Sequence, residues 1–397
     1  MATSSLLFAL AIAAGSVGQP RAIPSGQVDE QNNIFQRWWG TKLVWKFDAL
    51  PTSGQVPDYR VPYSGYYYPD AAGGTMRVLR KYDIAFNAGR LRATGHEQWD
   101  TTAYKEETMV PERVGLFRLR TRMVPSMETP HWYGHCNGWA AATIRHAEPQ
   151  KTVVRNGVSF TPADIKAMLA EIYMYSHYES LAGSDYLVDA GMLHVILANW
   201  LGRQSHPMAM DADPGRERWN FPIYSFTSSV TRRGERQVVV QTNIDYAYYS
   251  NGEYERSPRI ARRKYFHYGL DLNEQGEIVG GVYYRDSSII DLIWVPLRPV
   301  QGGKEGNERG NPYVDVNEVV SIWRDSVSDE IAAKWRNIDS GQEPAPQVAS
   351  APSASAPTDT ASSANPAASE GTATPAATTP SPANDENAPS PSPENRN

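Results

Sequence analysis

The sequence predicts an α+β fold in which central helices, one of them carrying a nucleophilic cysteine, pack on an antiparallel sheet. A helical pattern follows a capping sequence at residues 161–164, and a second helical stretch covers about 192–201. Beyond about residue 218, several segments alternate apolar and polar residues as strands do. Helices followed by a run of strands are typical of an α+β domain.

The composition limits the class of protein. The chain has 397 residues, 41% hydrophobic and 11% aromatic, which is enough for a sizeable core. A net charge of −6 without a long basic run argues against nucleic-acid binding. No run of about 18 apolar residues occurs, so no membrane span is predicted. A single cysteine, Cys136, excludes an internal disulfide and a thiolate metal cage.

Both ends of the chain are predicted to lie outside the folded body. Residues 1–18 contain a short apolar core followed by small residues, which predicts a secretory signal; a buried N-terminal helix is the alternative. Residues 342–397 are mostly Pro, Ala, Ser, Thr and acidic residues, which predicts a disordered tail. We therefore expect a secreted or periplasmic protein with an aromatic-rich N-terminal region at 30–130 and a catalytic core at 131–340.

The N-terminal region is rich in aromatic residues and turns. Trp45 and Phe47 alternate with polar neighbours, which predicts a half-buried strand. Residues 62–69 combine two prolines, a glycine and four tyrosines, which predicts a loop. We expect these tyrosines to form a packed cover, and a sugar-binding face is the alternative. Residues 151–160 are predicted to form a hairpin that turns at Asn156 and Gly157.

The middle of the chain is predicted to be helical. Thr161 supplies a capping hydroxyl, Pro162 fits the first helical position, and Asp164 places an acid in the first turn. Apolar residues then recur with helical spacing through residue 175. The stretch at about 192–201 is apolar nearly all round, so we expect it to be central.

The C-terminal part of the folded body is predicted to consist mainly of strands. The strand candidates are residues 236–250, 264–272, 277–284 and 289–295, with a turn at 273–276. A glycine-rich loop follows Pro296 and extends to Gly310. Two short helices are predicted near 315–324 and 328–335.

The segment 131–143, HWYGHCNGWAAAT, holds the candidate nucleophile Cys136. We expect a helix to begin at 140–143, close to this cysteine, whose thiol would then face free N–H groups and the positive end of the helix dipole. Both favour the thiolate, and the Cys136 N–H would hold an oxyanion. We expect Trp132, Asn137 and Trp139 to line the substrate site. The alternative is an inert, buried thiol.

A cysteine nucleophile needs an imidazole base and a group that orients it. His267 is the first candidate, because it lies on the strand face opposite to its apolar neighbours. Asp286 or Asp291 would orient it from a later strand. His194, in an apolar helix, is the rival candidate base, and its alternative role is that of a buried core histidine.

No metal site and no cofactor are predicted. His131 and His135 have the spacing of helical metal ligands, but Gly134 lies between them and no carboxylate is near in the sequence. The stretch 271–276 resembles the start of a calcium loop but has Val282 where a bidentate acid is required. Calcium is possible but not indicated. Asp211 and Asp213 are interpreted as caps of the loop before Trp219.

Three segments resemble a known family. GHCNGWAAA at 134–142 resembles the active-site segment of the transglutaminase-elicitor family, secreted enzymes of oomycetes and bacteria. RWNFPIY at 218–224 is similar to the family's Val-Trp-Asn-Gln-Pro-Val segment, from which it departs at Arg218 and Phe221. Residues 270–281 and 290–294 resemble a strand pair of the family that ends in an Asp before a Trp. The resemblance covers about residues 130–295.

The resemblance implies a core like that of cysteine proteases and transglutaminases. It also implies a cysteine acyltransferase, a protein-glutamine γ-glutamyltransferase. Cys136 would form a thioester with a glutamine side chain, His267 would protonate the ammonia, and a lysine amine would resolve the thioester. Its partners would be proteins that bear Gln and Lys side chains. The alternatives are a cysteine peptidase or amidase, and a non-enzymatic extracellular glycan-binding protein with an inert Cys136.

Overall fold

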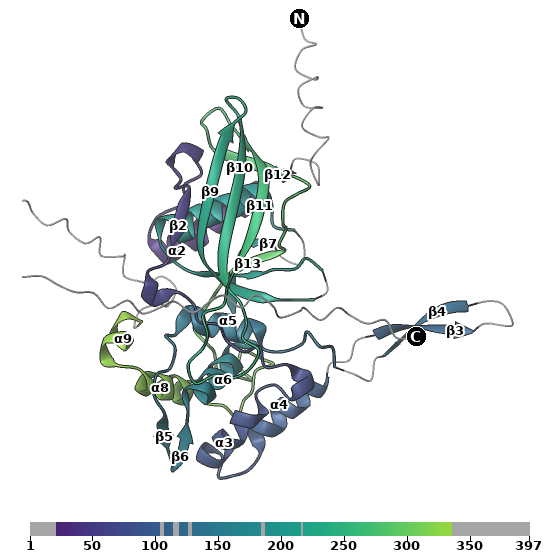
Figure 1. Ribbon diagram of the computed structural model, residues 1–397, viewed down its shortest axis with the longest axis vertical. Helices are drawn as coiled ribbons and strands as arrows, with labels where there is room; N and C mark the ends of the chain where they lie inside the picture. The colour runs from purple at the N-terminus through teal and green to yellow at the C-terminus, as the bar shows by residue number, and fades with distance from the viewer. Residues whose placement is uncertain are drawn as a thin grey trace, which may run out of the picture. The chain divides into compact units, whose positions relative to one another are not determined.

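The computed structural model describes residues 21–103, 107–113, 119–125, 129–183, 187–215 and 217–335. The signal segment predicted at 1–18 and the tail predicted at 342–397 lie outside these residues. The α+β prediction is confirmed, because helices accompany a nine-stranded sheet in which every recorded strand pair is antiparallel (Figure 1). The boundary predicted at residue 130 between two regions stays a prediction.

The main sheet has the strand order β1-β12-β11-β10-β9-β8-β13-β7, and β2 pairs with β9. The four strands predicted between residues 236 and 295 are confirmed as the long β10 and β11 and the shorter β12 and β13, and the long β9 was not among the predicted strands. Two further strand pairs, β3–β4 and β5–β6, form separate two-stranded sheets. The strand bounds are β1 (Arg21–Ala22), β2 (Ser53–Gln55), β3 (Glu107–Arg113), β4 (Leu119–Pro125), β5 (Val153–Arg155), β6 (Val158–Phe160), β7 (Tyr178–Gly183), β8 (Met208–Asp211), β9 (Asn220–Arg232), β10 (Gln237–Ala247), β11 (Ala261–Leu272), β12 (Ile278–Tyr283) and β13 (Leu292–Pro296).

The helices include those predicted from the sequence and three that were not. The helix after residue 161, the central helix and the two C-terminal helices are confirmed. Helices α2, α3 and α4 lie in the region interpreted as loops and strands. The bounds are α2 (Ser25–Trp39), α3 (Met76–Phe86), α4 (Arg92–Ala103), α5 (Cys136–Arg145), α6 (Pro162–Tyr173), α7 (Ala190–Ile196), the π-helix Leu197–Arg203 that continues α7, α8 (Val316–Ser326) and α9 (Asp329–Lys334), with 3₁₀ turns at Phe47–Ala49, Asp58–Arg60 and Asp70–Ala72.

The predicted cap of α6 is present and also connects two helices. The Thr161 hydroxyl accepts from the Asp164 N–H, and the Asp164 carboxylate accepts from the Thr161 N–H at 3.0 Å. The same carboxylate is bound by Arg77 at 2.9 Å and Lys81 at 2.5 Å, both on α3. The Thr161 hydroxyl therefore satisfies one N–H group of the first turn of α6, and the Asp164 carboxylate joins α6 to α3.

The strand predicted at Trp45 and Phe47 is wrong. Phe47 begins a 3₁₀ turn, and its ring stacks on that of His194 at 5.5 Å. Backbone pairing in this segment is limited to a bridge between Lys46 and Glu277. Pro51 follows closely, and a proline cannot donate to a strand ladder. Burial of the Phe47 ring against α7 thus determines the local structure, although Trp45 and Phe47 alternate with polar residues as in a strand.

The tyrosine-rich segment 62–69 is a loop, as predicted, and it packs against the protein. Tyr63 and Tyr68 are buried, and Tyr66 and Tyr67 are half-buried. The ring of Tyr66 contacts the rings of Tyr67 and Tyr68, with centroids 5.5 and 5.3 Å apart. These contacts favour the packed cover over a sugar-binding face.

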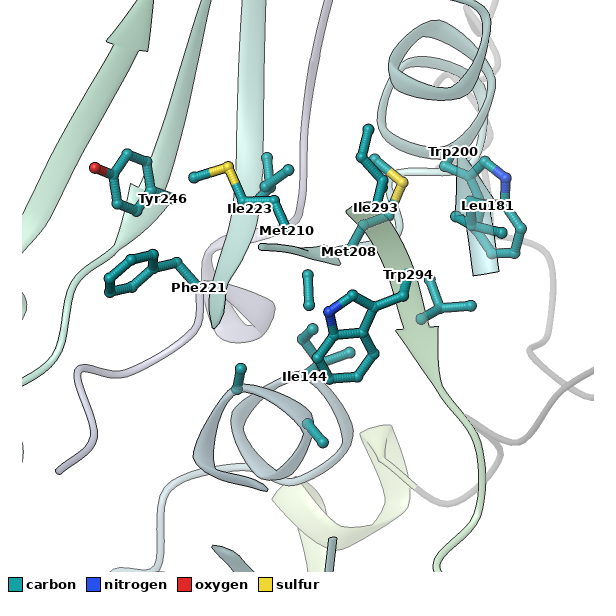
Figure 2. Close-up of a cluster of buried hydrophobic side chains, with 14 of the residues drawn as sticks. Ile144, Leu181, Trp200, Met208, Met210, Phe221, Ile223, Tyr246, Ile293 and Trp294 are labelled. Atoms are coloured by element: carbon teal, nitrogen blue, oxygen red, sulfur yellow. The ribbon is translucent and has the colours of Figure 1, made fainter. Parts of the chain in front are cut away.

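Helix α5 packs on the sheet through β8, β9 and β13. Figure 2 shows Trp294 of β13 lying over Ile144 of α5, with Met208 and Met210 of β8 beside it. All four side chains are buried. The core between α5 and the sheet therefore fixes where the N-terminus of α5, and with it Cys136, meets the strands. None of the described helices has the length and apolar character needed to cross a membrane.

Helices α5 and α6 approach each other closely at Gly138. A Cβ atom at this position would lie 2.2 Å from the carbonyl oxygen of Ala170. We expect Gly138→Ala to destabilise the protein by about 1–3 kcal/mol, because the backbones of the two helices must separate. Urea unfolding measures this change.

The matched control is Gly95→Ala in the exposed part of α4, where an added Cβ would meet no atom within 4 Å. This substitution is expected to stabilise the protein by about 0.5–1 kcal/mol, because alanine loses less backbone entropy than glycine in a helix. Equal effects of the two substitutions would contradict the close helix contact.

Candidate active site

The helix predicted to begin at Ala140 is present as α5, but it begins four residues earlier, with Cys136 as its first residue. The chain enters the helix through a tight contact with the tyrosine loop, since the His135 N–H donates to the Tyr67 carbonyl at 2.6 Å. A Cβ at Gly134 would lie 2.6 Å from the same carbonyl oxygen, so only glycine fits there. Cys136 is 5% exposed and lines a cavity of about 450 Å³.

The Cys136 thiol is held between two groups of the segment that leads into β9. Its S–H donates to the Arg218 carbonyl at 3.3 Å, and the Asn220 amide Nδ2 donates to Sγ at 3.7 Å. The Trp294 indole N–H donates to the Asn220 Oδ1 at 2.8 Å. Because the oxygen of the amide is fixed by the indole, its NH₂ group points at the sulfur.

The Asp211 carboxylate lines the same cavity as Cys136, and the Asp291 carboxylate lies near Asp211. Asp211 is the last residue of β8 and pairs in register with Asn220 of β9 and Leu292 of β13. Asp291 immediately precedes Leu292, and Asp211 accepts a hydrogen bond from the Trp219 N–H at 2.8 Å. Burial and the nearby Asp291 charge raise the pKa of Asp211 to about 7. Asp211 therefore changes charge near neutral pH beside the thiol.

The environment does not favour the thiolate that the sequence led us to expect. Burial raises the pKa of the Cys136 thiol to about 11, although hydrogen bonds from Asn220 act in the opposite direction. The Asp211 charge also raises this pKa. A position at the start of a helix thus does not lower the pKa of a thiol that is buried near the Asp211 carboxylate.

The structure does not bring His267 to Cys136. His267 on β11 pairs with Gln241 of β10, and Gln241 pairs with Ser229 of β9. Ser229 lies nine residues beyond Asn220, which is about 30 Å along a strand. The predicted partnership with Asp286 exists, because His267 Nδ1 lies 2.8 Å from the Asp286 carboxylate. This pair is remote from the nucleophile.

His194 is a core histidine on α7. It is buried, and its Nδ1 lies 2.9 Å from the Tyr268 hydroxyl. Burial lowers its pKa to about 4. The histidine that lines the Cys136 cavity is His177, an exposed residue that the sequence analysis did not select. Within the described part of the chain, the hydrogen-bond partners recorded for Cys136 include no imidazole.

Two of the three predicted substrate-binding residues line the cavity. Trp132 and Asn137 are in its wall, and the Asn137 amide also donates to the Met174 carbonyl at 2.6 Å. Trp139 is buried, packs against Gly65 and lies outside the cavity lining.

Sequence reasoning missed the roles of Asn220, Asp211 and Trp294 in this site. A signal was present for two of them, because Asn220 and Trp294 lie in segments that carry the family resemblance. For Asp211, the sequence indicated only a cap of the loop before Trp219.

A buried polar cluster lies next to Cys136 in the chain, around His135. The His135 Nε2 atom is 3.1 Å from a Glu171 oxygen and 3.5 Å from a Glu97 oxygen. Each of these three residues offers one atom that could bind a metal ion. Among the described residues, these three atoms form a group in which all lie within 4.8 Å of one another. Although burial disfavours a charged imidazole, the two carboxylates raise the pKa of His135 to about 10.

The chain therefore has an α+β fold in which a cysteine at the first turn of a helix packs on an antiparallel sheet that supplies an amide and a carboxylate. The crystal structure of the GP42 transglutaminase from Phytophthora sojae is similar to this structure, with a TM-score of 0.59 and 19% sequence identity. The similarity covers 77% of this chain and 99% of the GP42 chain. The family model described as Transglutaminase elicitor matches residues 117–187 and 174–256. This match covers less than half of the chain and shows a similarity of residues 117–256 to the transglutaminase-elicitor family. No curated protein matches the chain.

Proposed function

We propose that the chain is an extracellular protein-glutamine γ-glutamyltransferase in which Cys136 forms a thioester with a glutamine side chain. The observation that carries the proposal is the position of the Cys136 sulfur. It lies at the start of a helix, on the wall of a cavity and 3.7 Å from the Asn220 amide nitrogen. Such an amide, together with the Cys136 N–H, is suited to stabilise an oxyanion. The signal predicted at residues 1–18 supports export.

Asp211 serves as the general base in this proposal. Its carboxylate, with a pKa of about 7, takes the thiol proton when the sulfur attacks the glutamine carboxamide. The oxyanion that forms accepts hydrogen bonds from Asn220 and from the Cys136 N–H. Asp211 then returns the proton to the leaving ammonia, and the C–N bond breaks to give the thioester.

A lysine amine resolves the thioester in the second half of the reaction. The amine nitrogen attacks the acyl carbon and transfers a proton to Asp211, and the C–S bond breaks to release the isopeptide product. The Cys136 thiolate recovers its proton from Asp211. Trp132, Tyr175 and Trp294 contribute aromatic surface to the cavity, which limits the access of competing water.

The test is incorporation of a dansylated amine into casein by the wild-type chain and by Cys136→Ala. We expect fluorescent casein and an equal amount of released ammonia with the wild type and neither product with the variant. Equal incorporation by both chains would overturn the proposal. Ammonia released without incorporated amine would assign the reaction to an amidase, in which water resolves the thioester.

A second candidate function is non-catalytic binding of an extracellular ligand by the same cavity. It is favoured by the raised pKa of Cys136 and by the carbonyl and amide partners that the sulfur has in place of an imidazole. Iodoacetamide labelling of the native chain between pH 6 and 8 separates the two candidates. A thiol labelled no faster than in the denatured chain, together with no incorporated amine, would support binding without turnover.

A further inference from the structure

Three side chains from different helical segments meet at one buried point behind the nucleophile. Glu97 belongs to α4, Glu171 belongs to α6, and His135 directly precedes α5. Their exposed fractions are 2%, 6% and 1%, respectively. Fully buried carboxylates and imidazoles are rare in proteins unless they are paired or bind a metal.

The distances between the donor atoms fit the edges of a coordination polyhedron. The His135 Nε2 atom lies 3.1 Å from the Glu171 Oε2 and 3.5 Å from the Glu97 Oε1. Metal–ligand bonds of about 2.0–2.2 Å give ligand–ligand separations of roughly 3.0 Å in an octahedron and 3.4 Å in a tetrahedron. All three donor atoms also lie within 4.8 Å of one another.

Surrounding groups hold the carboxylates in place. The Thr75 N–H donates to the Glu97 Oε1 at 2.8 Å, and the Thr75 hydroxyl donates to the Glu171 Oε2 at 2.6 Å. The Asn311 amide donates to the other Glu171 oxygen at 3.0 Å. Such outer-sphere hydrogen bonds orient ligating carboxylates in metal sites.

Part of this polar group is left without a hydrogen bond. The His135 Nδ1 and the Asp70 Oδ1 are buried, have no hydrogen-bond partner within the described residues and lie 4.0 Å apart. A histidine that binds a metal through one ring nitrogen usually directs the other nitrogen at a carboxylate or carbonyl. Asp70, which also lines the Cys136 cavity, occupies that position.

The cluster around His135 also has more acidic than basic side chains. Three carboxylates, those of Asp70, Glu97 and Glu171, face a single imidazole, and the nearby Arg309 guanidinium binds Asp100 at 2.7 Å. A divalent cation among these groups would offset part of the negative charge of the acidic side chains.

We propose that Glu97, His135 and Glu171 bind one divalent transition-metal ion of the Zn²⁺ or Mn²⁺ class. One imidazole and two carboxylates suit these ions, whereas Ca²⁺ takes oxygen ligands. The ion fixes His135 and thereby the start of α5, so its role is to position Cys136. It takes no part in the acyl transfer, and the proposal stands independently of that reaction.

The test measures the metal content of the full chain, purified without a histidine tag and dialysed against Zn²⁺ or Mn²⁺. We expect about one ion per chain by elemental mass spectrometry, and a lower melting temperature after treatment with a chelator. Glu97→Gln and Glu171→Gln are expected to weaken metal affinity by more than about 100-fold, since loss of an outer-sphere partner alone weakens it by about 10- to 100-fold.

The matched control is His131→Ala, which removes an exposed histidine four residues before His135 and is expected to leave the metal content unchanged. If Glu171→Gln does not fold, Glu97→Gln with circular dichroism as a folding check provides the same comparison. A wild-type chain that retains less than about 0.1 ion, or glutamine variants that bind metal as tightly as the wild type, would overturn the proposal.

Discussion

Replacement of Asp211 by Asn is expected to lower kcat/KM for amine incorporation by about 100- to 10,000-fold, the usual contribution of a general base. The substitution preserves the oxygen that accepts the Trp219 N–H at 2.8 Å but cannot accept the proton of Cys136. In the wild type, activity should rise as the pH increases through the pKa of Asp211, about 7. The residual activity of the variant should not show this rise.

The stability of the same variant distinguishes a catalytic role from a structural one. The pKa of Asp211 is raised in the folded state, so its contribution to stability is fully present below the unfolded value of about 3.9 and is lost as the pH rises to about 7. Above pH 7, Asp211→Asn removes a buried charge, and its free energy of unfolding should not fall below that of the wild type.

Two substitutions serve as controls for Asp211→Asn. Asp213→Asn changes an exposed carboxylate two residues away and is expected to alter kcat/KM less than about 2-fold. His177→Ala tests the histidine that lines the cavity. A loss of activity with His177→Ala as large as that with Asp211→Asn would assign the base to the imidazole instead.

The largest expected loss of stability follows from Trp200→Ala. Trp200 is fully buried in the π-helix Leu197–Arg203. Its ring lies edge-on to those of Phe35 and Trp38 on α2, with centroids 5.6 and 5.3 Å apart, and to that of His206 at 5.7 Å. Removal of this side chain leaves a cavity between α2 and the central helix, and we expect a destabilisation of about 3–5 kcal/mol in urea unfolding.

The control for this measurement is Trp99→Ala, because Trp99 is 57% exposed on α4. We expect its effect to stay within about 0.5 kcal/mol of the wild type. Should Trp200→Ala not fold, Trp200→Phe is expected to give a smaller loss of about 1–3 kcal/mol. A Trp200 variant as stable as the wild type would contradict the packing of α2 on the π-helix.

The elements that could be predicted are those whose local pattern agrees with their tertiary environment. The cap of α6, the hairpin at Asn156 and Gly157, and strands β10 to β13 each combine a turn or cap signal with matching burial. Helix α4 was not predicted because most of its buried residues are polar. Thr94, Glu97 and Asp100 are buried through partners elsewhere in the chain, so the hydrophobic periodicity of a packed helix is absent.

The candidate site could be predicted only in part, for a similar reason. The glycines and alanines around Cys136 are a local signal, so the start of α5 was predictable. The face of β11 that carries His267 was also predictable, because Phe266 and Tyr268 are buried on the other side. The distance of His267 from Cys136 depends on strand register across three strands, which no local pattern encodes. Asn220 and Asp211 lie near the Cys136 thiol because β8 and β9 pair in a particular register, which the local sequence does not encode either.

The hydrogen bond between Trp294 and Asn220 has a consequence for a chain that is still being synthesised. Cys136 leaves the ribosome well before Trp294, the residue that orients the Asn220 amide toward the sulfur. Until β13 has been made and inserted between β7 and β8, the Cys136 sulfur lacks its oriented amide. In the reaction proposed above, the order of translation would therefore delay acyl transfer until the folding of the chain is nearly complete.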